Sequence, residues 1–261
     1  MRYEFKARTV SEILDGTFKL YRDHWQPLLT IAALLSIPTM IFSGFADWLS
    51  KAAKAGSVDA AMAPMLGVLV SLPLVILAAT VEYCALTSAT VDAYLGRPFT
   101  VGGAIRRAFS LFFPLLWVGL LFYVAVGFGF LLLVIPGVYL TLIWAVWLQA
   151  VVVEDKRGSA ALGRSRQLTR GATGRLGWLL LAFLAVQLAL VYGIHAAIPA
   201  ALSDIPFLGA ALADVPSVLI APVYPAVLTL FYFDGRIRHE GWDLEQKVAE
   251  GVAPPASAAL P

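Results

Sequence analysis

One stretch of this chain is too long and too apolar for a water-soluble fold. Residues 111–153 contain no Asp, Glu, Lys or Arg. As a continuous helix this stretch would be about 65 Å long, roughly twice the hydrocarbon thickness of a bilayer. Pro136 and Gly137 lie near its middle, and this pair is typical of a turn. The stretch therefore predicts two membrane spans, at residues 113–134 and 138–153, joined by a tight hairpin.

The composition agrees with a membrane protein. Hydrophobic residues make up 60% of the 261 positions and charged residues only 14%, whereas a soluble domain is about a quarter charged. We expect an all-α polytopic membrane protein in which residues 1–251 form one domain and residues 252–261 a disordered tail. Six spans in three hairpins are predicted, at residues 27–45, 64–89, 113–134, 138–153, 176–197 and 215–233.

Amphipathic helices are predicted to precede the hairpins. In residues 9–25, apolar side chains recur at helical spacing and charged side chains occupy the opposite face. Thr9 and Ser11 are candidate caps of this helix. Residues 100–112 repeat the pattern, with Thr100 in the place of Thr9, and residues 158–170 show it more weakly. Helices of this kind lie in the membrane interface. The chain then consists of three units, each an interfacial helix followed by two spans; three unrelated hairpins remain the alternative.

The distribution of positive charge predicts the orientation. Of the 19 Lys and Arg residues, five lie before the first span, three after the second, six in residues 154–175 and three after the sixth, which makes 17 on one face. Only Lys51 and Lys54 lie on the other face. Because cytoplasmic loops carry the excess of Lys and Arg, both termini are predicted to be cytoplasmic, with the spans in the cell (inner) membrane.

Glu82 is the one carboxylate well inside an apolar run. A charge at this depth costs about 2.5–3.5 kcal/mol, so it normally faces protein or water. It is either a group that handles a proton or a substrate, or a neutral, hydrogen-bonded glutamate near the interface. We expect it to face the bundle interior, with Gln149, Gln187, Tyr83 or an interfacial Arg as partner. An unaffected Glu82→Leu variant would contradict that expectation.

Two further groups of residues are candidates for function. Pro38, Pro73, Pro222 and Pro225 mark either broken helices that line a cavity or ordinary kinks. The second group is the charged residues of the predicted cytoplasmic face. They either bind anionic lipid headgroups or a protein partner, or serve only to set the orientation. Each cation near an anionic membrane surface contributes about 1 kcal/mol to binding. The candidates are Arg106, Arg107, Arg164, Arg166, Arg170, Arg175, Asp234, Arg236, Arg238, Glu240 and Asp243.

The sequence contains no motif that predicts an enzyme. It has no His-Glu-x-x-His run, no phosphate-binding glycine loop and no nucleophile elbow. His24, His195 and His239 lack metal-ligand spacing, and Cys84, inside an apolar run, is expected to be a buried packing residue. We therefore expect no catalysis, metal, cofactor or nucleic-acid partner; membrane lipids, a protein partner or a second copy of the chain are the expected partners.

Several stretches resemble a bacterial membrane family, the glycerophosphoryl diester phosphodiesterase membrane domain. The similar stretches are residues 10–21, Ile135-Pro136-Gly137, residues 151–154, residues 161–171, and residues 232–245 with the sequence YFDGRIRHEGWDLE. In some members this module is fused to a catalytic barrel that uses paired histidines and acidic metal ligands. Since this chain has three scattered histidines and no room for a barrel beyond its six predicted spans, the resemblance implies the membrane module without catalysis.

Two functions follow as hypotheses. The first is a non-enzymatic membrane component that binds lipid or a partner through its basic cytoplasmic face and residues 234–245. The alternative is a small transporter or lipid-translocating protein with Glu82 in the path, and an intramembrane hydrolase is a distant third. A polar cavity that contains Glu82 would favour transport, whereas a sealed apolar core with lipid at the basic rim would favour the first function.

Overall fold

The protein is all helical in the part of the chain that the structure describes. The computed structural model describes residues 6–54, 56, 62–201, 215–242 and 244, and these contain no strand. The helices are α1 (Val10–Asp23), α2 (Trp25–Lys54), α3 (Met62–Tyr94), α4 (Val101–Ser110), α5 (Phe112–Leu132), α6 (Val134–Ile143), α7 (Trp147–Glu154), α8 (Ser159–Thr169), α9 (Thr173–Ala201), α11 (Val215–Ile220) and α12 (Val223–Glu240). The predicted all-α fold class is confirmed.

Five helical segments of the described chain are long and apolar enough to cross a membrane. They are Trp25–Phe42, Leu74–Tyr94, Phe112–Leu132, Val134–Glu154 and Val215–Glu240. A sixth is added if α8 and α9, which meet at an angle of 99°, are counted as one broken span. All six predicted spans therefore fall on helices, but α9 qualifies only together with α8.

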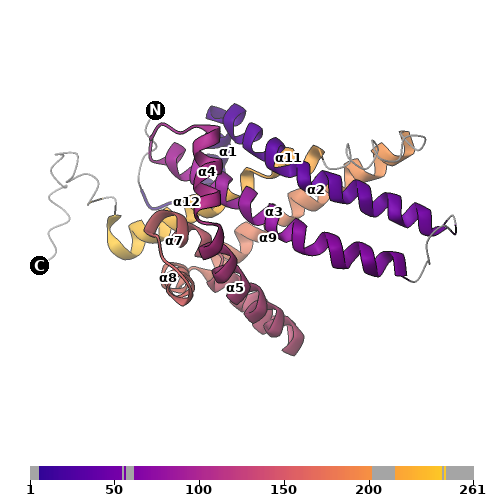
Figure 1. Ribbon diagram of the computed structural model, residues 1–261. Coiled ribbons are helices and arrows are strands. Elements are labelled where there is room, and N and C mark those ends of the chain that lie inside the picture. Colours follow the sequence, from indigo (N-terminus) through magenta and orange to yellow (C-terminus); the bar gives the residue numbers. More distant parts are fainter. Residues whose placement is uncertain (1–5, 55, 57–61, 202–214, 243, 245–261) are drawn as a thin grey trace, which may run out of the picture.

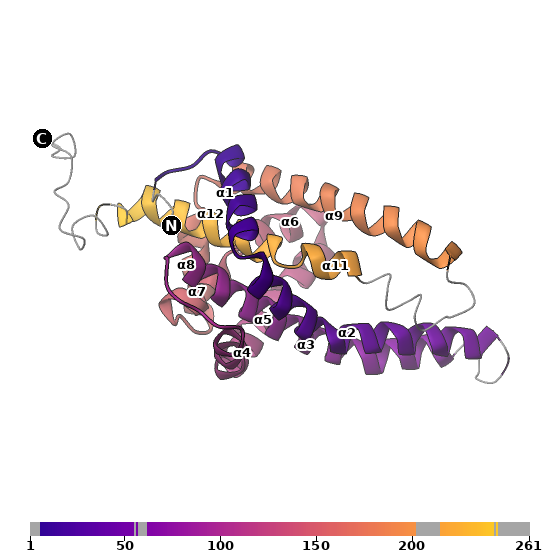
Figure 2. The same cartoon turned by 90° about the horizontal axis from the view of Figure 1, so that it is seen from above.

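Three groups of helices extend from a packed end (Figures 1 and 2). One is α5 with α6, and we call the other two arms: the antiparallel pair α2 and α3, which pack against each other, and α9. At 30, 33 and 29 residues, these helices are about 45–50 Å long, more than a hydrocarbon core requires. Helix α11 lies between the arms and contacts both α2 and α9.

Helix α12 is the centre of the packed end. Its residues from Pro225 to Gly235 are buried on all sides, as expected of a helix that is apolar all round. It packs against α1, α3 and α8. The Phe233 ring stacks on Tyr94 of α3 with centroids 4.9 Å apart, and Trp242 contacts its other side at 4.9 Å. Phe231, Tyr232 and Phe233, at the end of the last predicted span, are thus part of the core of the molecule.

The short helices begin at the predicted caps. The Thr9 hydroxyl accepts the Glu12 N–H at 3.3 Å, and the Glu12 carboxylate accepts the Thr9 N–H at 2.8 Å, which forms a capping box at the start of α1. Thr100 caps α4 through the N–H of Gly103 at 3.1 Å. The predicted helices at 9–25, 100–112 and 158–170 correspond to α1, α4 and α8, each followed by two longer apolar segments.

The predicted turn at Pro136 and Gly137 is wrong by a few residues. The chain reverses at Leu133, which is extended with φ −162° and ψ 151°, and α6 begins at Val134. Pro136 lies in the first turn of α6, where the missing N–H leaves no intrahelical bond unmade. Gly137 lies against α5, because a Cβ on it would be 2.4 Å from Cγ of Phe130. Pro136 and Gly137 therefore lie in the first turn of α6, and the turn of the hairpin is at Leu133.

Other predicted boundaries differ in length. Helix α2 continues to Lys54 and α3 to Tyr94, past the predicted ends at residues 45 and 89. The fourth predicted span is divided between α6 and α7 at residues 144–146, and the sixth is interrupted at residues 221–222 between α11 and α12. The predicted tail at 252–261 lies outside the described residues.

Candidate functional site

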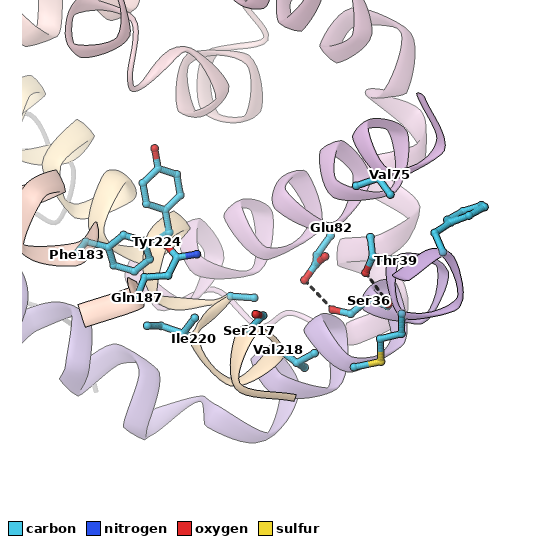
Figure 3. A pocket seen from close by; sticks show the side chains of 13 residues that line it. Ser36, Thr39, Val75, Glu82, Phe183, Gln187, Ser217, Val218, Ile220 and Tyr224 are labelled. Atoms are coloured by element: carbon cyan, nitrogen blue, oxygen red, sulfur yellow. Dashed lines mark hydrogen bonds between the residues drawn. The ribbon is translucent and has the colours of Figure 1, made fainter. Parts of the chain in front are cut away.

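A cavity of about 680 Å³ lies between the two arms. Its walls come from α2, α3, α9, and the residues on both sides of the break between α11 and α12 (Figure 3). Glu82 projects into it from α3, as predicted for the bundle interior. The cavity is therefore bounded by segments from three different parts of the chain, and it holds the one carboxylate that lies deep in an apolar run.

The Glu82 carboxylate has one hydrogen-bond partner among the described residues. The Ser36 hydroxyl of α2 lies 3.1 Å from Glu82 Oε1 and also 2.6 Å from the Ala32 carbonyl oxygen. A hydroxyl has one proton to donate, so it serves either acceptor but not both. The carboxylate consequently retains acceptor capacity toward the cavity, and a protonated Glu82 would have a proton to donate there.

The opposite wall is polar at one point and aromatic at another. Gln187 of α9 and Ser217 of α11 face the cavity, as do Phe183 and Tyr224 (Figure 3). The Phe183 and Tyr224 rings are tilted against each other with centroids 5.1 Å apart. Tyr83 packs on the far side of Tyr224 at 5.4 Å. A ligand between the walls would meet hydrogen-bonding groups and the faces of aromatic rings.

The wall between α11 and α12 is a broken helix. The helix is interrupted at Ala221 and Pro222, and proline cannot donate an N–H to continue the ladder. Next to this break, the Leu219 carbonyl accepts the Tyr21 hydroxyl of α1 at 3.0 Å. Irregular backbone at membrane depth is tolerated where it is buried in protein or lines a cavity. Of the predicted prolines, Pro222 lies at such a break, next to the cavity.

The structure brings together some of the predicted intramembrane residues and separates others. Glu82 and Gln187 line the same cavity. Gln149 is completely buried in α7 and does not line it; its amide atoms have no hydrogen-bond partner among the described residues. The expectation that Gln149, Gln187, Tyr83 or an Arg bonds Glu82 is wrong, since the bonded partner is Ser36.

Several lining residues were missed by the sequence reasoning. Ser36, Thr39 and Ser217 are isolated hydroxyls in apolar runs, and Phe183 and Tyr224 are ordinary aromatic residues there. Serine and threonine commonly bond their own helix, as Thr39 does with the Ser36 carbonyl at 2.7 Å. The spacing of Ser36 and Thr39 on one face of α2 is a weak signal, and nothing local links them to Ser217.

Most of the predicted cytoplasmic binding residues are paired within the protein. Asp234 is buried in α12 and forms ion pairs with Arg175 of α9 and, at 3.0 Å, with Arg238. It also accepts the backbone N–H of Arg8 at 2.6 Å, while Arg175 and Arg238 bond the Arg8 carbonyl at 3.0 and 2.8 Å. Asp234 thus joins the segment before α1 to α9 and α12.

A second network joins α7, α8 and α12. Arg164 donates to Glu154 at 2.8 Å and pairs with Glu240, which also pairs with Arg236 at 3.1 Å. The Tyr232 hydroxyl donates to Glu154 as well. Three of these five residues, Arg164, Arg236 and Glu240, were predicted to bind lipid or a partner. Their side chains hold the helices together.

The remaining candidates differ in exposure. Arg107 donates to the Val152 carbonyl at 2.7 Å. Arg106, Arg166 and Arg170 are exposed, and Asp243 lies outside the described residues. In the described chain, no group of three His, Cys, Asp or Glu side chains is placed to hold a metal ion.

The helices and the cavity define the class of protein as an all-α protein whose apolar helices are compatible with a multi-pass membrane protein. Comparisons with known protein families, with curated proteins and with solved structures found no match. The resemblance to the phosphodiesterase membrane domain therefore stays a prediction from the quoted residues.

Proposed function

We propose that this protein is a non-enzymatic transporter of the bacterial cytoplasmic membrane, and that it binds its solute in the cavity around Glu82. The observation that supports this is the cavity itself, where Glu82, Gln187 and Ser217 meet between apolar helices. Ionisable residues within membrane helices are costly and commonly mark substrate or ion pathways. The broken helix at Pro222 supports the same function, because discontinuous helices form substrate sites in many transporters.

This proposal reverses the order of the two hypotheses drawn from the sequence. Binding through residues 234–245 would need their charges to be available to a ligand. Asp234, Arg236 and Glu240 are instead engaged with other parts of the chain. A cavity that contains Glu82 was the observation expected to favour transport.

The test is to purify the protein in native lipid and identify by mass spectrometry what remains bound. Ser217→Phe fills the cavity from α11, and Leu120→Phe on the exposed face of α5 is the matched control. We expect a small molecule to copurify with the unaltered protein and the Leu120 variant but not with the Ser217 variant. Equal retention by all three folded proteins would contradict the proposal.

Lipid binding remains a second candidate, supported by the exposure of Arg166 and Arg170 on α8. Since α8 meets α9 at 99°, it would lie along the membrane surface if α9 crosses it. Two arginines there would attract anionic headgroups by about 2 kcal/mol in total. The double variant Arg166→Gln/Arg170→Gln should retain less anionic lipid than Lys54→Gln, and equal lipid content would exclude this function.

We also propose, on the resemblance of residues 232–245, that the described helices are a module of the phosphodiesterase membrane-domain family. In this structure Tyr232, Asp234, Arg236, Arg238 and Glu240 all have internal partners. Such a motif would preserve the packing of the module, which supports a shared fold without a shared reaction.

A further inference from the structure

We infer that the cavity takes a lipophilic organic cation, which exchanges with a proton on Glu82. This inference rests on the proposed transport function and names the class of solute. It follows from three properties of the cavity: a carboxylate without a cationic neighbour among the described residues, an aromatic wall, and apolar side chains over much of the remaining lining.

The first property is that Glu82 has no cationic side chain beside it among the described residues of the lining. Among the described residues that line the cavity, none is Lys, Arg or His. The comparison is Asp234, the other carboxylate buried by apolar helices, which has Arg175 and Arg238 beside it. A carboxylate in a weakly polar environment is costly unless it is paired or neutralised by a proton. Among the described residues Glu82 has no such cationic neighbour, so a proton or a cationic ligand would neutralise it.

The aromatic wall is the second property. Phe183 and Tyr224 lie opposite Glu82 across the cavity (Figure 3), with ring centroids 5.1 Å apart. The faces of aromatic rings attract organic cations, and this attraction grows when water is excluded. A cation between Glu82 and this wall would have a negative charge on one side and aromatic side chains on the other.

The remaining lining selects the shape and polarity of the cation. Met40, Val75, Val218 and Ile220 contribute apolar surface, and the volume of about 680 Å³ is within the range of small-molecule sites. An inorganic cation would leave most of that surface without a partner. A cation that carries apolar or aromatic groups would use both the charge of Glu82 and the apolar walls.

Glu82 is also the group that can exchange a proton. The facing residues Ser36 and Thr39 of α2, Gln187 of α9 and Ser217 of α11 do not titrate near neutral pH. Tyr224 is the other titratable residue of the lining, and an unperturbed tyrosine titrates only at about pH 10. One proton therefore leaves Glu82 as one monovalent cation enters, and the net charge of the cavity is unchanged.

The experiment uses two ions of nearly identical shape and opposite charge. Tetraphenylphosphonium and tetraphenylborate are each equilibrated with the full-length protein in detergent, and bound ion is measured by dialysis at several pH values. Glu82→Gln removes the charge at nearly constant shape. Asp155→Asn is the matched control, since it removes one exposed carboxylate far along the sequence, at a left-handed position that Asn tolerates.

We expect the cation to bind the unaltered protein and the Asp155 variant alike, and the borate not to bind. Affinity for the cation should rise by up to about tenfold per pH unit while Glu82 is protonated. Glu82→Gln should weaken it by roughly thirtyfold or more, as for loss of one partner of a buried charge pair. If that variant does not fold, Phe183→Leu should weaken cation binding several-fold through the lost cation–π contact.

Equal binding of the two ions, or unchanged binding after both Glu82→Gln and Phe183→Leu, would overturn the assignment of a cation. The transport proposal would survive that result if Ser217→Phe still expelled a copurified neutral or anionic molecule. If the cavity-filling variant also retained every bound molecule, the site itself would be excluded. The two failures are thus distinguishable.

Discussion

Asp234 and Glu82 are both carboxylates within apolar helices, and their surroundings differ in charge. Asp234 is fully buried between two arginines and a backbone N–H. Glu82 has one serine hydroxyl and an open cavity. The first arrangement satisfies the charge within the protein, as structural ion pairs do, while the second leaves it to be satisfied by a proton or a ligand.

Asp234→Asn is expected to lower the free energy of unfolding by about 3–5 kcal/mol, because it leaves Arg175 and Arg238 without their buried partner. The measurement is unfolding in mixed micelles, followed by tryptophan fluorescence. Asp155→Asn removes an exposed pair with Arg157 and should cost only about 0–1 kcal/mol. Equal losses in the two variants would show that the Asp234 network does not stabilise the packed end.

The ionisation of Glu12 predicts how the stability of α1 depends on pH. Its hydrogen bonds with the Thr9 backbone and side chain, together with the nearby Lys6 ammonium, lower the pKa of Glu12 from 4.5 to about 2. Because the folded pKa is lowered, this capping box stabilises α1 above pH 4.5, and its contribution is lost as the pH falls toward 2. The measurement is the titration of the Glu12 side chain by NMR.

Thr9→Val keeps the size of the side chain and removes its hydroxyl, so the pKa of Glu12 should move back up toward 4.5. Val at the N-cap should also weaken the start of α1, because valine cannot accept the N–H of Glu12. Asp155→Asn, remote in sequence, should leave the Glu12 titration unchanged. A pKa of Glu12 that is the same in the Thr9 variant would contradict the capping-box assignment.

At the scale of the helices, α5 and α6 are held close by glycines. A Cβ on Gly129 would lie 3.1 Å from the Gly137 backbone, and a Cβ on Gly137 would lie 2.4–2.6 Å from the Phe130 ring. Small residues allow this close approach between membrane helices, where packing replaces the hydrophobic driving force. The hairpin therefore depends on the absence of side chains at these two positions.

Gly137→Ala is expected to destabilise the protein by about 1–3 kcal/mol, the usual cost of overpacking. The control is Gly127→Ala in α5, where the added methyl group meets nothing within 4 Å. That variant should be neutral or gain up to about 1 kcal/mol from helix propensity. The same unfolding assay measures both variants, and a neutral Gly137→Ala would show that Phe130 can move away at no cost.

The helices were largely predictable from the sequence because their signals are local. Apolar length predicted the spans, and Thr9 and Thr100 predicted two helix starts. The turn near Pro136 was misplaced because proline fits the first turn of a helix as well as a turn. Helix ends beyond the bilayer, such as Lys54 in α2, were missed because hydropathy measures the apolar core and not the helix.

The candidate site was predictable only at the residue whose chemistry conflicts with its surroundings. Glu82 is conspicuous in an apolar run, whereas Ser36, Phe183 and Tyr224 are ordinary residues there. Their assembly depends on how α9 and α11 pack against α2 and α3, which no local pattern specifies. The same limit hid the pairing of Asp234 with Arg175, which are 59 residues apart.

At the scale of the whole molecule, the ion pairs and the predicted orientation are linked. The segment before α1, the start of α9 and the C-terminal part of α12 are tied together at Asp234. If the apolar helices cross a membrane, these segments are therefore on one side of it, as an even number of crossings requires. The end of α2 at Lys54 and the start of α3 at Met62 lie at the tip of the α2–α3 arm, away from the packed end (Figure 1).

Cysteine labelling tests this arrangement, because the chain has one native cysteine, Cys84, which is completely buried. In a Cys84→Ala background, Lys54→Cys should react with a membrane-impermeant maleimide on intact cells, since the positive-inside rule places Lys54 outside. Arg170→Cys, on exposed α8, should react only after the membrane is permeabilised. The reverse pattern would show that the protein has the opposite orientation. Labelling of both positions on intact cells would contradict an odd number of spans between them. In either case the basic α8 would not face the cytoplasmic leaflet, and binding of its anionic lipids through Arg166 and Arg170 would be excluded.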